Sequence, residues 1–529
     1  MTIPPHWARW GDPDLAQPLP DSARGLVDAA FGPLADHLSV GLDAVRLPEP
    51  ALPPETLDGL RALVGAEHVH LDHETRVRHT RGKSTPDLLR MRAGDGSDAP
   101  DVVVRPAGHD QVAAVVEWCG RHRVALVPFG GGTSVVGGLA ARRDGYAGVL
   151  ALDLSRLDRL VALDAESGTA VLEAGVLGPR AESLLGEHGF TLGHFPQSFE
   201  YASIGGFAAT RSSGQSSSGY GRFDSLVLGL KVATPIGTWQ LGHAPASAAG
   251  PDLRQLVLGS EGAFGVITEV TLRVRPVPPV RVYEGWRFGS FAAGAAAVRD
   301  LVQAGVTPTV LRLSDEIETA VNLSSPSAVG GGEGGGGCVL ITGYEGEPDG
   351  VEALRAATGA RLAALGADPL GEGPGTAWER GRFAGPYLRD SLLDVGVLVE
   401  TLETATFWSQ LLSLYERVRT AVVRALAGQG APSLVLGHIS HVYPTGASLY
   451  FTVVAKELAD PLAEWTVAKT AASEAIAAAG ATITHHHGVG RDHQPWLAQE
   501  IGPVGVEVLR AVKQRIDPSG VLNPGILVP

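Results

Sequence analysis

The sequence contains little cysteine and has no excess of positive charge. Two cysteines, Cys119 and Cys338, occur among 529 residues. This number excludes a disulfide framework and a zinc site built from thiolates, and it favours a reducing compartment. The formal net charge of -15 argues against a nucleic-acid partner, because binding nucleic acid requires a concentrated basic surface.

Targeting and membrane-spanning segments are also missing. Met1–Leu15 has no basic region followed by an apolar stretch, so no signal peptide is predicted. Ser433–Ala455 lacks Asp, Glu, Lys and Arg but contains His438 and Pro444. We expect buried strands and turns there, because a spanning helix needs about 20 mostly apolar residues. These observations predict a soluble, cytoplasmic protein.

The length and the pattern of apolar residues predict more than one folded unit. A chain of 529 residues exceeds what one hydrophobic core usually supports, and 44% hydrophobic residues suffice for a sizeable interior. Val102–Val104 reads as a strand, His109–His122 has helical spacing, and Ala125–Pro128 reads as a second strand. Strand, helix and strand within about 30 residues predict an α/β unit.

A glycine-rich loop follows the second of these strands. Pro128–Ser134 reads Pro-Phe-Gly-Gly-Gly-Thr-Ser. Three successive glycines let consecutive backbone N–H groups turn toward one anionic ligand, and the two hydroxyl groups add donors. The spacing fits neither the Rossmann nor the Walker A pattern. Alone, such a loop could equally be a tight turn.

Two further glycine-bearing segments accompany this loop. They are Leu192–Arg211, with Ser198, Ser203 and Thr210 as donors, and Leu258–Thr268, which leads into a strand. Three polar glycine loops that feed the strands of one domain fit an extended dinucleotide better than a mononucleotide.

The three segments resemble the PCMH-type FAD-binding domain of the vanillyl-alcohol oxidase superfamily. Within it the chain is most similar to the alkyldihydroxyacetonephosphate synthase family, through Pro251-Asp252, Arg312-Leu313 and His485–Gly490. The resemblance implies an α+β fold, with an α/β-type FAD-binding domain and a cap domain whose antiparallel sheet is flanked by helices. We expect a partly helical segment over 1–98, the FAD-binding domain over 99–276, the cap over 277–500 and a tail over 501–529 that returns to the FAD domain.

The resemblance also implies which residues hold FAD. Pro128–Ser134 would cradle the pyrophosphate, Phe195–Tyr201 and Ala208–Arg211 would line the flavin, and Ser260–Val266 would hold the far side. Relatives with covalent flavin carry a histidine beside the first loop; its absence here predicts non-covalent FAD. The predicted cofactor residues are Pro128, Phe129, Gly130, Gly131, Gly132, Thr133, Ser134, Pro196, Gln197, Ser198, Tyr201, Ser203, Ala208, Thr210, Arg211, Glu261, Gly262, Gly265, Val266 and Ile267.

Histidines and a tyrosine mark the candidate reaction centre. On a regular strand, His485 and His487 would face one side and His486 the other, so the three histidines could not all bind one metal. The alternative is that the triplet is a polar surface strand. The resemblance places the triplet at the flavin, with His486 and His487 in proton transfer or phosphate binding and His485 at the substrate. It makes Tyr450 the acid/base, although a core tyrosine is the alternative.

An arginine and two departures from the family bear on the substrate. Arg312 lies in an apolar strand and needs either Asp315 or Glu316 as partner, or an anionic substrate, which the resemblance favours. Gln410 stands where the family has an arginine that contacts substrate phosphate, and Gln197 stands where it has an acidic residue. Both changes affect the substrate prediction and leave FAD binding intact.

Two enzymatic functions remain open. The first is a transferase that forms an ether bond by exchanging a fatty acyl group for a fatty alcohol, with the flavin bonding covalently to the substrate carbon. The alternative is an FAD-dependent oxidoreductase of a 2-hydroxy acid or related alcohol. The metal-dependent form of such an oxidoreductase is disfavoured, because Tyr450 and His486 stand at two of the three positions where relatives of this type have metal ligands. No metal is therefore predicted. A flavin-binding protein without catalysis is a third reading. We expect a small or lipid-like substrate; peripheral membrane contact and a homodimer stay open.

Overall fold

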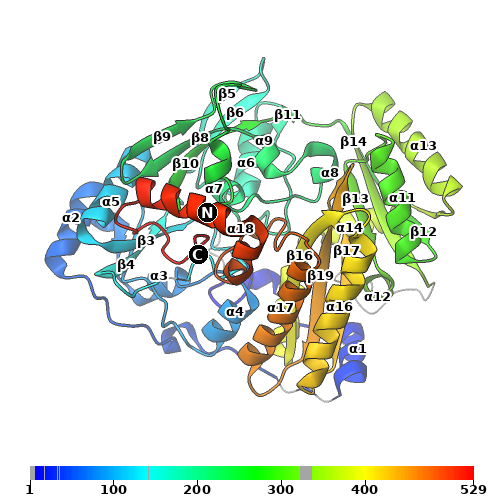
Figure 1. The fold of residues 1–529 in the computed structure, drawn as a ribbon, viewed down its shortest axis with the longest axis horizontal. Helices are drawn as coiled ribbons and strands as arrows, with labels where there is room; N and C mark the ends of the chain where they lie inside the picture. The colour runs from blue at the N-terminus through cyan, green and yellow to red at the C-terminus, as the bar shows by residue number, and fades with distance from the viewer. Residues whose placement is uncertain (1–5, 17, 33, 35, 141, 322–335) are drawn as a thin grey trace.

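The computed structural model describes residues 6–16, 18–32, 34, 36–140, 142–321 and 336–529. Two lobes lie side by side in Figure 1. The first lobe contains the sheets formed by β1–β11, and the second contains the sheet formed by β12–β19. Each lobe has its own large cluster of buried apolar side chains.

The strand–helix–strand unit predicted from the sequence is present in the first lobe. It consists of β2 (Val102–Val104), α5 (His109–His122) and β3 (Val124–Phe129). The two strands do not pair with each other; both run parallel to β4 (Gly148–Asp153), which lies between them. The order is β1-β2-β4-β3, with β1 (Val69–His70) antiparallel to β2.

The larger sheet of the first lobe is antiparallel. Its order is β5-β6-β10-β8-β9, and its strands are Leu160–Asp164, Thr169–Glu173, Val266–Arg273, Val227–Thr234 and Gly237–Leu241. β7 (Phe190–Thr191) pairs with β11 (Arg275–Pro276). Short helices link these strands: α6 (Gly178–Gly186), α7 (Ile204–Thr210), α8 (Ser217–Tyr220), α9 (Phe223–Leu226) and α10 (Arg254–Val257).

The second lobe is built on one antiparallel sheet. Its order is β15-β12-β14-β13-β17-β19-β16, and β18 pairs with β19. In chain order the strands are β12 (Val280–Phe288), β13 (Val310–Ser314), β14 (Cys338–Gly346), β15 (Asp368–Gly371), β16 (Val397–Phe407), β17 (Ser433–Ile439), β18 (Val442–Tyr443) and β19 (Gly446–Lys456).

Helices cover this sheet (Figure 1). The long pair α16 (Leu411–Gly428) and α17 (Pro461–Ala478) packs together. Pro461 stands at the first helical position of α17, and the Asp460 side chain accepts the Ala463 N–H, so local sequence defines this helix start. The others are α11 (Phe291–Gln303), α12 (Glu316–Ala320), α13 (Pro348–Ala364), α14 (Glu372–Gly381) and α15 (Gly385–Asp394). No helix among the described residues is long and apolar enough to cross a bilayer.

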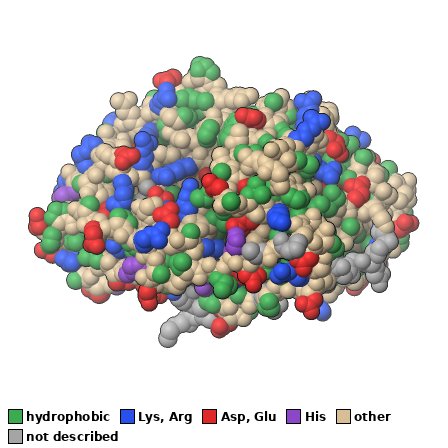
Figure 2. All heavy atoms as spheres, turned by 90° about the horizontal axis from the view of Figure 1, so that it is seen from below, with side chains coloured by type: hydrophobic (Ala, Val, Ile, Leu, Met, Phe, Trp, Pro, Cys, Tyr) green, Lys and Arg blue, Asp and Glu red, His purple; other side chains and the backbone are tan. Residues whose placement is uncertain are grey.

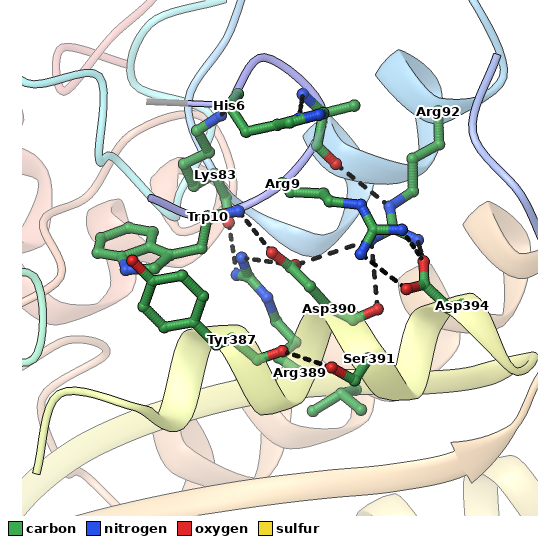
Figure 3. Close-up of polar contacts among 12 residues, drawn as sticks. His6, Arg9, Trp10, Lys83, Arg92, Tyr387, Arg389, Asp390, Ser391 and Asp394 are labelled. Atoms are coloured by element: carbon green, nitrogen blue, oxygen red, sulfur yellow. Dashed lines mark hydrogen bonds and ion pairs between the residues drawn. The ribbon is translucent and has the colours of Figure 1, made fainter. Parts of the chain in front are cut away.

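Both ends of the chain contact distant elements. α1 (Asp21–Phe31) packs on α15 and β16 in the second lobe. The next helices along the chain are α2 (Pro54–Val64), α3 (His73–Arg78) and α4 (Thr85–Arg92). After α18 (Gln494–Ile516), which is kinked at Gly502, the Asn523 N–H bonds to the Leu126 carbonyl in the first lobe. Ion pairs of Arg9 and Arg92 with Asp394 attach the N-terminal segment to α15 (Figure 3).

The face in Figure 2 carries basic side chains interspersed with acidic and hydrophobic ones. This pattern agrees with the net charge of -15 and does not resemble the concentrated basic surface that nucleic acid requires.

Candidate active site

The first and second glycine segments approach each other closely. A Cβ atom built on Gly131 would lie 1.6 Å from the Tyr201 carbonyl oxygen, and one on Gly130 would lie 2.3 Å from Ser203 Oγ. Gly132 has a φ of +69°, which favours glycine. Only glycine fits these positions, so the turn presents bare backbone to the space beside it.

That space is a cavity between the two lobes. Its walls in the first lobe contain most of the predicted cofactor residues: Pro128, Gly130, Gly131, Gly132, Thr133, Ser134, Pro196, Gln197, Ser198, Ser203, Thr210, Glu261, Gly262, Gly265 and Ile267. The second lobe contributes Arg312, His438, His441, Tyr450, His486 and His487. A polar wall of backbone and hydroxyl donors fits the diphosphate of a dinucleotide, and the first-lobe wall contains no histidine or cysteine among the described residues.

Five residues predicted to bind the cofactor do not line this cavity. They support the loops from behind: Phe129, Tyr201, Ala208, Arg211 and Val266. Phe129 packs on the His79 ring, the Ala208 carbonyl accepts the Gly259 N–H, and Arg211 forms an ion pair with Asp224 at 3.1 Å. A resemblance over a continuous segment does not separate residues that face the ligand from those on the opposite side of the chain.

Glu261 joins the third glycine segment to the histidine-bearing segment of the second lobe. Its Oε2 atom accepts the N–H groups of Val489 and Gly490 at 2.9 and 2.8 Å. Burial raises the pKa of Glu261 to about 7. Its backbone carbonyl accepts a hydrogen bond from the side-chain amide of Asn523. One residue thus contacts the cavity, the histidine segment and the C-terminal tail.

Glu403 on β16 organises the histidine triplet. Its carboxylate accepts the N–H groups of His485, His486 and His487 and the Thr484 hydroxyl. Burial favours the neutral acid, but the nearby histidines hold the pKa of Glu403 well below its ordinary value. Donation of hydrogen bonds to the ionised form acts in the same direction, so Glu403 is a buried carboxylate.

The predicted alternation of the three histidines along a strand is wrong. His485–His487 form a bend, because consecutive N–H groups of a regular strand point in opposite directions and could not reach one carboxylate. His486 and His487 both line the cavity, and their ring centres are 4.7 Å apart. His485 lies behind them and bonds to the Tyr443 hydroxyl at 2.6 Å. Burial lowers the pKa of His486, and it lowers that of His487 to about 3.

Tyr450 on β19 lies in the cavity wall. Its ring stacks on His438 with centres 4.8 Å apart, and the rings of His486 and His487 are 6.2 and 5.8 Å away. Burial raises the pKa of Tyr450 to about 12. Tyr450 is therefore a neutral phenol next to neutral imidazoles. This arrangement offers a proton donor and proton acceptors in one place.

Arg312 has a different partner from those expected. Its guanidinium bonds to Glu318 at 2.6 Å and to the His438 ring, not to Asp315 or Glu316. Asp315 instead caps α12 by accepting the Glu318 N–H at 2.7 Å, and the first turn of this helix carries Glu318 back over the end of the strand. The Nε atom of Arg312 is buried and has no hydrogen-bond partner.

Gln410 is not in the cavity. It is exposed at the N-terminal end of α16, three residues beyond the end of β16. Its prediction as a substrate residue is not supported by this position. Gln197 does line the cavity.

Three ring nitrogens near the triplet have a spacing that could hold a metal ion. They belong to His441, His485 and His486 and lie within 4.8 Å of one another. Two of them, His441 and His485, are not at the metal-ligand positions that the sequence comparison considered.

Glu403 and His438 were not predicted as site residues. The signal for Glu403 was present: it is one of two acidic residues in a strand whose other residues are apolar or threonine, and a buried charge there needs partners. Nothing in the sequence indicated that those partners are the N–H groups of the histidine triplet.

Known families match both lobes. A model described as "FAD binding domain" matches residues 100–241, and one described as "FAD linked oxidases, C-terminal domain" matches residues 277–527. Together with the fold and the cavity, these matches define an FAD-dependent enzyme of the FAD-linked oxidase class.

The relatives narrow this class. Alkyldihydroxyacetonephosphate synthases from Trypanosoma brucei brucei and Dictyostelium discoideum are each 32% identical to this chain, over 92% of it and over 82% and 83% of their own lengths. A solved structure of an alkyldihydroxyacetonephosphate synthase superposes with a TM-score of 0.86 at 29% identity, covering 99% of both chains. The chain belongs to the alkyldihydroxyacetonephosphate synthase family. A mitochondrial D-lactate dehydrogenase from Arabidopsis thaliana is 26% identical over 90% of the chain and 81% of its own length.

These findings confirm the predicted resemblance, the α+β fold class and the dependence on FAD. The mode of flavin attachment, the domain boundaries and the roles of the individual site residues stay predictions.

Proposed function

We propose that the protein forms an ether bond on acyl-dihydroxyacetone phosphate by exchanging the fatty acyl group of this substrate for a fatty alcohol, using non-covalently bound FAD. The observation that carries this proposal is the apolar part of the cavity wall. Besides the polar loops, the wall contains side chains from α1, α15, β16, β17 and β19: Ala23, Leu26, Val27, Ala30, Phe31, Leu388, Leu392, Val399, Leu434, Leu436 and Val454. An aliphatic chain fits this wall, and a small hydroxy acid would leave it uncovered.

The chain's own residues supply positioning and proton transfer. FAD, held by the glycine loops of the first lobe, would supply the nucleophile that the exchange requires. His486 and His487 are neutral at physiological pH because burial lowers their pKa values. A neutral imidazole can accept the proton of the incoming alcohol hydroxyl. The Tyr450 phenol, with its pKa raised to about 12, can donate a hydrogen bond to a substrate oxygen. These roles are proposals.

The reaction balances without an external oxidant. The bond between the substrate carbon and the acyl oxygen breaks, the bond to the alcohol oxygen forms, and fatty acid is released. The direct test is to incubate the holoenzyme with acyl-dihydroxyacetone phosphate and a fatty alcohol. We expect fatty acid and alkyl product in equal amounts with no net bleaching of the flavin. Absence of product with several chain lengths would refute the proposal.

A second candidate is oxidation of a 2-hydroxy acid. The similarity to the D-lactate dehydrogenase and the cluster of His441, His485 and His486 favour it. Anaerobic addition of D-lactate would bleach the flavin if this function is correct. The two assays give opposite results for the two candidates.

A further inference from the structure

A second cavity, of about 530 Å³, lies next to the histidine triplet. Tyr443 and His485 contribute to its wall, and the wall reaches the protein surface at Gln255, which is exposed. Among the described residues, two line both this cavity and the one between the lobes: Thr210 and His486. Of these two side chains, only the imidazole of His486 exchanges protons near neutral pH.

A continuous chain of hydrogen bonds joins His486 to this second cavity. The Nδ1 atoms of His486 and His485 are 3.0 Å apart, and Nε2 of His485 is 2.6 Å from the Tyr443 hydroxyl oxygen. Both ring nitrogens of His485 are therefore part of the chain. The Nε2 atom of His486 forms no hydrogen bond within the part of the chain that the structure describes, so this atom remains for a ligand between the lobes.

This chain has two neutral states. A neutral imidazole carries one N–H group and one bare nitrogen, so one of the two Nδ1 atoms donates to the other. In the first state His486 donates to His485, the Nε2–H of His485 donates to the Tyr443 oxygen, and Nε2 of His486 is bare. In the second state each bond runs in the opposite direction, and Nε2 of His486 carries a proton. Passage between the two states moves one proton from end to end.

The environment of the chain favours such a concerted transfer. Burial lowers the pKa of His486 and lowers that of His485 well below its ordinary value. Burial also raises the pKa of Tyr443, which the nearby positive charge of Arg222 opposes. An isolated imidazolium or phenolate is therefore unfavourable here. A chain in which each group releases one proton as it gains another keeps all three groups neutral.

The proposed exchange moves two protons at the site. The acyl group leaves as a fatty acid, which requires a proton on the departing carboxylate. The alcohol gives up its hydroxyl proton when its oxygen bonds to the substrate carbon. In each turnover one proton is therefore delivered and one is removed, and a route between the site and solvent serves both steps.

We propose that His485 and Tyr443 form a proton relay between His486 and the second cavity. When the acyl group leaves, the Nε2–H of His486 protonates the carboxylate. His485 then protonates His486, Tyr443 protonates His485, and solvent in the second cavity protonates Tyr443. When the alcohol reacts, its proton passes to Nε2 of His486 and the relay runs in reverse.

The two transfers cancel, so the relay returns to its starting state after every turnover. His485 and Tyr443 do not contact the substrate and act only through His486. The inference rests on the proposed function for the reaction that delivers and consumes the protons.

The test is chemical rescue of Tyr443→Phe and His485→Ala holoenzymes in the exchange assay. The first variant removes only the hydroxyl group, and the second leaves space for a ring beside the second cavity. Tyr146→Phe is the control, because Tyr146 is half-buried in the first lobe and its hydroxyl donates to the Gly520 carbonyl at 2.7 Å. All proteins are first dialysed against EDTA, since ring nitrogens of this region are close enough to hold a metal ion.

We expect both relay variants to lower kcat about 10- to 100-fold, with unchanged KM and flavin content, because proton transfer is slowed while substrate and cofactor contacts remain. Added imidazole can enter the second cavity and replace the missing group. It should raise kcat several-fold in both variants and leave the wild type and Tyr146→Phe unchanged. A purely structural loss would not respond to imidazole.

A kcat of Tyr443→Phe within about twofold of wild type overturns the inference. A loss of kcat that imidazole does not restore overturns it as well. If Tyr443→Phe fails to retain flavin, His485→Ala decides by the same two measurements.

Failure of the relay and failure of the proposed function give different results. Exchange by the wild type with unaltered turnover in Tyr443→Phe refutes the relay alone. Absence of exchange by the wild type refutes the proposed function. The same comparison in the anaerobic D-lactate assay then decides the relay, because oxidation of a hydroxyl group also releases a proton. A wild-type enzyme without either activity overturns both.

Discussion

The carboxylate of Glu403 accepts the backbone N–H group of His487 at 2.9 Å. The same carboxylate accepts the two preceding N–H groups of the triplet, so its charge determines the shape of this bend. A positioning residue of this kind affects turnover without touching the substrate.

We predict that Glu403→Gln lowers kcat about 10- to 100-fold and lowers the free energy of unfolding by about 1–3 kcal/mol. The amide group adds two donors where N–H groups already point, so at least one contact is lost. A kcat, KM and thermal-unfolding comparison tests this, with the exposed Glu416→Gln on α16 as control. Unchanged kcat in Glu403→Gln would show that the bend does not depend on this carboxylate.

Tyr450→Phe keeps the ring stacked on His438 and removes only the hydroxyl group. We predict a fall in kcat of about 10²- to 10⁴-fold, the range for loss of a general acid or base, with an unaltered flavin spectrum. Tyr344→Phe is the control, because Tyr344 is buried in the second lobe, outside the cavity wall, and bonds to Thr342. Equal turnover of Tyr450→Phe and wild type would remove Tyr450 from the mechanism.

Gly131→Ala should produce a protein with little bound FAD. The added Cβ atom would fall 1.6 Å from the Tyr201 carbonyl, so the first two glycine segments must separate. Gly186→Ala is the control, since no atom lies within 4 Å of its added Cβ. The ratio of flavin to protein absorbance after purification measures the effect. A full flavin content in Gly131→Ala would contradict the predicted role of this turn.

Acid precipitation should release all FAD into the supernatant. The wall of the first lobe has no histidine or cysteine side chain, among the described residues, that could bond to the isoalloxazine ring. The measurement is the absorbance of supernatant and pellet after precipitation in trichloroacetic acid. Yellow colour that stays with the polypeptide would refute non-covalent attachment.

Lys83 makes the stability depend on pH. Burial lowers its pKa from 10.5 to about 7, and its ammonium contacts the His6 and Trp7 carbonyls (Figure 3). Between pH 7 and 10.5 the unfolded chain holds a proton that the folded chain lacks, so this residue's contribution to stability rises with pH, by up to about 1.4 kcal/mol per unit.

Lys83→Met removes this dependence. The stability of the variant relative to wild type should therefore be highest at or below pH 7 and should fall as the pH rises to 9. Unfolding midpoints of both proteins at pH 6, 7, 8 and 9 test this, with Lys231→Met as control because Lys231 is ion-paired with Glu269 at 2.9 Å. A constant difference across this range would show that Lys83 stays charged.

The sequence predicted elements whose causes are local. α5 was predicted over His109–His122, the boundaries that the structure shows, because its apolar spacing and end signals lie within the segment. The start of α16 at Leu411 depends on a distant contact, because Trp408 lies in a turn where its indole N–H bonds to the Tyr443 carbonyl. That partner is 35 residues away, so no local pattern contains it.

The same distinction holds for the site. The glycine loops were visible because their composition is unusual over a few residues. The bend of the histidine triplet depends on Glu403, and the state of Arg312 depends on Glu318 and on His438 in another strand. Contacts of this kind arise only when the sheet has assembled.

The bond network of Glu261 bears on how ligands enter and leave. A hinge motion that parted the two lobes would remove two N–H donors from the buried carboxylate of Glu261. α1 contacts α15 and β16 through a small apolar cluster, so moving α1 alone would leave the Glu261 bonds and the Asp394 ion pairs of α15 in place. Entry and release of apolar ligands past α1 are therefore less costly than entry and release through separation of the two lobes.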